Sequence, residues 1–149
     1  MSKILMFILV LIFAFSTFAY AQEKYTVSGE IKFPKRQGVI CTQLLTQEEY
    51  ENRKTPPPER NLTIKPNPQE LEAKRVNFNF TAVPKGDYII YCHQDLNENG
   101  ILDSVEGVWF KNPTEPQGFT GRQFWGSDLW DDIKLEVDKD ISGIDIEMR

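Results

Sequence analysis

Residues 95–106 carry a pattern of residue types and spacing that points to one particular chemistry. They read D-L-N-E-N-G-I-L-D-S-V-E and fill every specified position of the calcium-loop pattern D-x-[DN]-x-[DN]-G-x5-E. Ca²⁺ is a hard cation that takes about six to eight oxygen ligands at roughly 2.3–2.6 Å. A loop of alternating inward-pointing oxygens can supply them, so the pattern predicts a calcium ligand without implying a reaction.

The predicted ligands are six residues of this loop. Gly100 occupies the position where the chain turns sharply and a Cβ would obstruct it. Carboxylate and amide oxygens suit Ca²⁺ better than zinc or copper, which prefer His or Cys. The ligands are the side chains of Asp95, Asn97, Asn99 and Asp103, the backbone carbonyl of Ile101, and Glu106 as the closing carboxylate.

The same residues also make good turn chemistry, because Asn and Gly tolerate positive φ, so a plain turn is the alternative. The segment before the loop, Tyr88–Cys92, has the composition of a strand, and the segment after it has no helical pattern. The loop is therefore expected on a β-framework, not in a helix–loop–helix hand. Its affinity is expected to be weak, on the order of 0.1–1 mM.

The N-terminal 21 residues have the form of a secretory signal peptide. Lys3 precedes an apolar run over 4–15, and Ala19-Tyr20-Ala21 forms a cleavage site. That run of 12 residues is shorter than the roughly 20 needed to span a membrane. We expect cleavage after Ala21 and a soluble exported protein, periplasmic or secreted; an uncleaved N-terminal anchor is the alternative.

The remaining residues, 22–149, suit one domain with one core. They number 128 and carry 16 basic and 22 acidic side chains, a net charge of −6. This acidic balance without a basic run argues against nucleic acid as a partner. Cys41 and Cys92 each fall in a predicted strand, so either a disulfide or two buried thiols fits an oxidising compartment.

Short strand patterns separated by turn signals predict an all-β fold, a small antiparallel β-sandwich with long loops. Residues 46–72 are expected to form a polar surface loop with one short helical turn at 46–53, capped by Thr46. Residues 107–127 are expected to be irregular. The predicted strands are Tyr25–Phe33, Gly38–Leu45, Arg75–Ala82, Tyr88–His93, Asp128–Val137 and Ile141–Met148.

No nucleophile motif or phosphate loop occurs, and His93 stands without a catalytic partner in the sequence, so we expect no enzyme activity. The acids Glu115, Asp128, Asp131 and Asp132 show no spacing typical of a hydrolase pair and are expected to be solvated. Trp109, Trp125 and Trp130 lie close together in the sequence. They are expected to pin a loop onto the sheet, and a carbohydrate-binding module that uses exposed aromatics is the alternative function.

Most of the chain after residue 21 resembles the bacterial exported family called domain of unknown function 2141, with the specific motifs in residues 86–120. The matching segments are G-D-Y-I-I-Y-C-H-Q-D-L-N-E-N-G-I-L-D and P-T-E-P-Q-G-F-T. The resemblance implies an immunoglobulin-like or transthyretin-like β-sandwich from the cell envelope, with no assigned activity. The matching positions are Gly86, Tyr88, Asp95, Asn97, Asn99, Gly100, Asp103, Glu115, Pro116, Gly118 and Phe119.

The chain departs from the family pattern at three places. Gln94 stands where the family has His, with His93 one place earlier, and Trp109 replaces a Pro. Glu106 is not part of the pattern. The resemblance therefore makes Glu115, brought back by the following segment, an alternative to Glu106 as the closing ligand.

Overall fold

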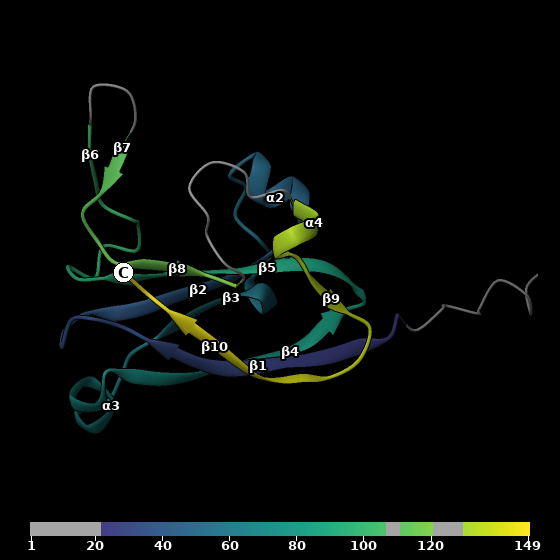
Figure 1. Ribbon diagram of the computed structural model, residues 1–149, viewed down its shortest axis with the longest axis horizontal. Helices are drawn as coiled ribbons and strands as arrows, with labels where there is room; N and C mark the ends of the chain where they lie inside the picture. The colour runs from purple at the N-terminus through teal and green to yellow at the C-terminus, as the bar shows by residue number, and fades with distance from the viewer. Residues whose placement is uncertain (1–21, 107–110, 121–129) are drawn as a thin grey trace, which may run out of the picture.

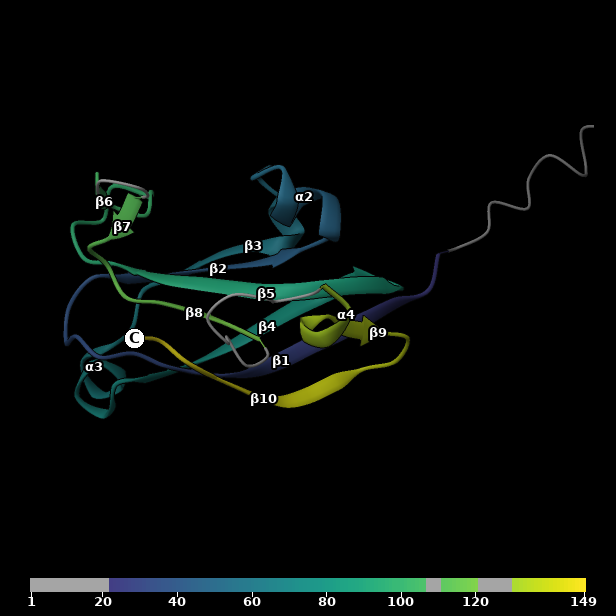
Figure 2. The same cartoon turned by 45° about the horizontal axis from the view of Figure 1, so that its top comes forward.

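The computed structural model describes residues 22–106, 111–120 and 130–149. Two sheets face each other across one core, with the loops gathered at the ends (Figures 1 and 2). The first sheet has the order β10 (Ile141–Glu147), β1 (Lys24–Lys32), β4 (Arg75–Pro84). The second has the order β3 (Asn61–Ile64), β2 (Val39–Leu45), β5 (Gly86–Asp95), β8 (Gln117–Phe119), and β9 (Leu135–Val137) pairs with the start of β5. The prediction of an all-β sandwich is confirmed.

Side-chain alternation explains how each strand joins the core. In β4, Val76, Phe78 and Phe80 are buried, whereas Asn77 and Asn79 on the opposite face are exposed. The two sheets bury their facing rows against each other, which is the main stabilising term of such a fold. The members of the core that are almost fully buried are Phe80, Ile31, Ile40, Leu44, Ile90, Ile146, Val27, Val83 and Val137.

One strand pair departs from the antiparallel prediction. β10 runs parallel to β1, with Ile31 opposite Ile146, while β4 is antiparallel on the other side of β1. After β10 the chain crosses toward the second sheet, where Arg149 and Gln117 exchange two backbone hydrogen bonds of 3.0 and 3.1 Å. The C-terminus thereby joins the two sheets at one corner of the sandwich.

Residues 46–72 are more structured than the sequence predicts. The helical turn is confirmed as α2 (Gln47–Glu51), with Thr46 as its cap. The prediction of an irregular loop beyond it was wrong: the segment contains η1 (Pro58–Arg60), the edge strand β3 and α3 (Pro68–Ala73). Arg60 anchors it, because this nearly buried guanidinium forms two 2.7 Å hydrogen bonds to Glu49 and another to the carbonyl of Leu44.

The segments after the 95–106 loop also differ from the prediction. A short hairpin of β6 (Ser104–Glu106) and β7 (Lys111–Pro113) follows the loop, and β8 comes next, within the stretch expected to be irregular. The described part of the predicted strand 128–137 is divided between α4 (Trp130–Ile133) and β9. These strands have only three residues each, too few for a period of two to be visible in the sequence.

The two cysteines are free thiols and cannot pair across β2 and β5. Cys41 lies opposite His93, whereas Cys92 lies opposite Thr42. Side chains of successive strand residues point to opposite faces, so Cys92 enters the core while Cys41 points to the outer face of the sheet. The disulfide alternative is therefore excluded by the register, and both thiols are buried.

Candidate metal centre

The 95–106 loop begins where β5 ends, and the turn between β1 and β2 packs against the first residues of the loop. Gly38 has φ +83°, and a Cβ there would lie 2.2 Å from the carbonyl oxygen of Asp95. Gln94, which is fully buried, donates from Nε2 to the carbonyls of Lys35 and Gln37 at 2.7 and 2.8 Å. Gln94 is a positioning residue that the sequence did not reveal, since it stood out only as a departure from the family's His.

Hydrogen bonds from the loop's own backbone wrap it around Asp95. The two carboxylate oxygens of Asp95, a residue only 1% exposed, accept from the N–H of Asn99 at 3.2 Å and of Gly100 at 2.6 Å. The side-chain oxygens of Asn97 and Asn99 each accept from the N–H two residues later, which is the Asx-turn arrangement. Gly100 has φ +82°, a left-handed conformation that favours glycine.

The side chains of the next predicted ligands gather on one side of this turn. Asn97 Nδ2 donates to one oxygen of Asp103 at 2.6 Å, and Asn99 Nδ2 donates to the other at 3.0 Å. The side chains of Asn97 and Asn99 are thus each within hydrogen-bond distance of the Asp103 carboxylate, and Asp95 contacts the same turn. Ile101 points its side chain outward, 63% exposed, as expected of a residue that offers only its carbonyl.

Glu115 closes the loop from the far side. Its Oε1 accepts from the N–H of Leu96 at 2.6 Å and its Oε2 from the N–H of Asp103 at 3.0 Å, so one carboxylate bridges both ends of the loop. Glu115 is only 6% exposed, and the expectation that it is a solvated acid was wrong. The structure thus brings the alternative closing residue to the loop. The backbone of Glu106 pairs with Lys111 in the β6–β7 hairpin, and its side chain lies outside the described part of the structure.

These residues fit a calcium ion by the chemistry of their donor atoms. Among the described residues no three His, Cys, Asp or Glu side chains converge as a metal-binding group. The loop instead combines the carboxylates of Asp95 and Asp103 with amide and carbonyl oxygens, which are ligands for Ca²⁺ and not for softer metals. The amide nitrogens of Asn97 and Asn99 now face Asp103, so both amides would have to turn their oxygens inward to bind an ion.

His93 and Cys41 face each other across β5 and β2, close to the start of the 95–106 loop. Both are buried, and neither ring nitrogen of His93 has a hydrogen-bond partner within the described ranges. Burial raises the pKa of the Cys41 thiol and lowers the pKa of the His93 imidazole. Both shifts favour the neutral forms, the opposite of the thiolate–imidazolium pair that a cysteine nucleophile needs.

The predicted aromatic site is only partly within the described residues. Trp109 and Trp125 lie outside them. Trp130 starts α4, where its ring lies 6.4 Å from that of Tyr50 on α2. Phe119 lies on β8, with its ring 4.8 Å from Tyr91 and 6.3 Å from Tyr50. Trp130 therefore links α4 to α2, and Phe119 links α2 to the outer face of the second sheet.

Together, the fold and the loop define a class of small β-sandwich proteins with an oxygen-rich loop at the end of a central strand. Among the described residues, no helix is long and apolar enough to cross a membrane. The chain belongs to DUF2141, a family described as uncharacterized protein conserved in bacteria, whose model matches residues 18–144. No match was found among curated proteins or among solved structures.

Proposed function

We propose that this chain is an exported, non-enzymatic β-sandwich protein whose 95–103 loop binds one Ca²⁺ as a structural ion. The observation that carries the proposal is the clustering of Asn97, Asn99 and Asp103 above a turn that Asp95 and Glu115 already hold in shape. A plain turn needs the oxygens of Asn97 and Asn99, which cap backbone N–H groups, but it does not need both amides to meet the carboxylate of Asp103. Asp95, Asn97, Asn99, Asp103 and the carbonyl of Ile101 would hold the ion, with Glu115 or Glu106 completing the shell.

The role of the ion would be to hold together carboxylates that otherwise repel. With a dissociation constant on the order of 0.1–1 mM, 10 mM Ca²⁺ would stabilise the folded protein by about 1.4–2.7 kcal/mol. For a domain of this size that corresponds to a rise in melting temperature of roughly 5–12 °C.

The test is thermal melting of the mature protein in 10 mM Ca²⁺, in 10 mM Mg²⁺ and in EDTA. Asp103→Asn is the most informative variant, because among the described residues the Asp103 side chain accepts from the two amides and from no backbone N–H. Glu98→Gln is the matched control: it removes the same charge from an exposed position of the loop that supplies no predicted ligand. We expect a calcium-specific rise in wild type and control and its loss in Asp103→Asn. Identical melting in Ca²⁺ and EDTA would exclude the site.

Export is supported by the sequence of residues 1–21, which lie outside the described residues. N-terminal sequencing of the protein recovered from a bacterial host should begin at Gln22. A product that retains Met1 would contradict cleavage.

A further inference from the structure

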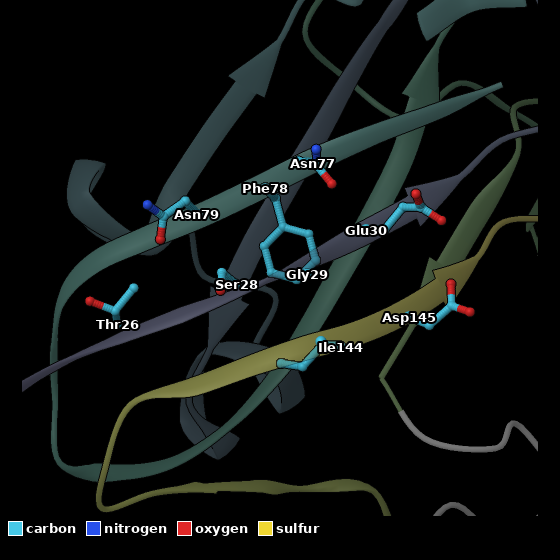
Figure 3. A pocket seen from close by; sticks show the side chains of 10 residues that line it. Thr26, Ser28, Gly29, Glu30, Asn77, Phe78, Asn79, Ile144 and Asp145 are labelled. Carbon is cyan, nitrogen blue, oxygen red and sulfur yellow. The ribbon is translucent and has the colours of Figure 1, made fainter. Parts of the chain in front are cut away.

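The outer faces of the two sheets each carry a hollow. The hollow on the first sheet, of about 650 Å³, is open, and its lining mixes polar residues such as Ser28, Asn77 and Asn79 with Phe78 and Ile144 (Figure 3). Its carboxylates are already paired: Glu30 contacts Arg75, and Asp145 contacts Lys32. This hollow has the character of a solvated strand surface.

The hollow on the second sheet is a groove of about 730 Å³ that two raised segments enclose. One wall is α2 and the residues after it, and the other comes from Leu102 in the metal loop and Pro113 in β7. Figures 1 and 2 both show α2 and the β6–β7 hairpin standing on the same side of this sheet, separated along its length. The volume lies within the roughly 300–1,000 Å³ typical of small-molecule sites.

The floor of this groove combines aromatic rings with amides. Tyr91 and Phe119 are cross-strand neighbours on β5 and β8, both half-buried, with ring centroids 4.8 Å apart. Gln43 lies opposite Tyr91 on β2, and Gln117 lies two residues before Phe119 on β8. Tyr50 from α2 extends the aromatic surface, with its ring edge-on to Phe119 at 6.3 Å.

The charges of the lining balance. Its acids are Glu49 and Glu51, and its bases are Arg53 and Lys54. Glu49 is held by Arg60, Lys54 pairs with Glu48, and Glu51 accepts from Gln47. A groove without net charge gives no selective attraction to an anion or a cation.

We propose that this groove binds a neutral oligosaccharide segment. A sugar ring has an apolar face of C–H groups that can lie on Tyr91 and Phe119, and a rim of hydroxyls that both donate and accept. The amides of Gln43 and Gln117 both donate and accept as well, so they match hydroxyls better than they match a purely apolar or a charged ligand. The groove is built from described residues only, and its floor of Gln43, Tyr91, Gln117 and Phe119 contains no proposed calcium ligand.

The test is isothermal titration of the mature protein with neutral oligosaccharides, namely cellohexaose, xylohexaose, laminarihexaose and chitohexaose. A hexagalacturonide and a tyrosine-containing hexapeptide serve as the acidic and the peptide comparison. We expect at least one neutral oligosaccharide to bind at millimolar concentration or below, and neither comparison ligand to bind more tightly.

Matched variants place the binding in the groove. Phe119→Leu and Tyr91→Leu keep apolar volume but remove the ring, and each should weaken binding about tenfold or more. Gln43→Leu should weaken it through lost hydrogen bonds and serves as a second probe if the β8 variant does not fold. Asn79→Ala removes an exposed amide from the outer face of the first sheet, away from the groove, and should leave the affinity unchanged. The proposal is wrong if no neutral oligosaccharide binds, if the acidic or peptide ligand binds best, or if the ring variants bind as wild type does.

Discussion

Replacing Glu115 with Gln tests whether one buried carboxylate holds the metal loop closed. Each oxygen of Glu115 accepts one backbone N–H, from Leu96 and from Asp103. Gln offers one acceptor oxygen and turns an NH₂ group toward the other N–H. A hydrogen bond to a charged acceptor contributes about 1.5–3 kcal/mol, and an unsatisfied donor costs about 1–3 kcal/mol. Because part of the loop can relax into water, we expect a loss of about 2–4 kcal/mol and a melting temperature lower by roughly 8–15 °C.

The assay is urea and thermal unfolding in EDTA, where calcium makes no contribution. Glu98→Gln again serves as the control, since this exposed charge should change stability by no more than about 0.5 kcal/mol. If Glu115→Gln also lies within that range in EDTA, the two hydrogen bonds do not stabilise the loop and the reasoning fails. A loss that appears only in the presence of Ca²⁺ would instead identify Glu115 as a ligand of the ion.

Two further substitutions test the charged contacts. The hydrogen bonds of Arg60 hold the pKa of Glu49 below its ordinary value of 4.5. The stability from this pair is therefore fully present above pH 4.5 and is lost as the pH falls through the lowered pKa. Glu49→Gln should lower the free energy of unfolding by about 2–4 kcal/mol at pH 7. Urea unfolding from pH 7 to pH 3 should show this difference between variant and wild type shrinking as the pH falls. A difference that stays constant would contradict the prediction. Asn97→Asp places a carboxylate where an amide now donates to Asp103 at 2.6 Å. It should lower the melting temperature in EDTA and enlarge the rise caused by Ca²⁺; an unchanged or smaller rise would count against the metal site.

The parts of the fold that the sequence predicted are those with a local signal. The alternation in Arg75–Phe80 and the capping pair Thr46 and Glu49 are local patterns, and the structure confirms both. The alternation was expected to continue to Ala82, but that residue has φ +58° and is exposed, and Val83 is buried instead. The parts that it did not predict depend on long-range pairing. β3 and β8 are too short to show a period, and the parallel partner of β1 comes from the other end of the chain.

The candidate site shows the same division. The residue types at 95–103 indicated the turn, because Asn side chains fold back onto the backbone two residues later. Glu115 was found only through the family resemblance, since it approaches the loop from beyond the β6–β7 hairpin. The groove could not be predicted, because Gln43, Tyr91 and Phe119 meet only through the register of three strands.

The same contacts that shape the loop would also set its affinity for the proposed Ca²⁺ ion. The amides of Asn97 and Asn99 donate to Asp103 and so neutralise part of the repulsion that Ca²⁺ would otherwise relieve. Binding must break both hydrogen bonds, and this cost is subtracted from the gain of the new metal–oxygen contacts. Glu115 and the backbone of the loop hold the turn in place in either state. The loop is therefore preorganised in its backbone but not in its amides, which favours weak structural binding over the tight binding of a dedicated calcium buffer.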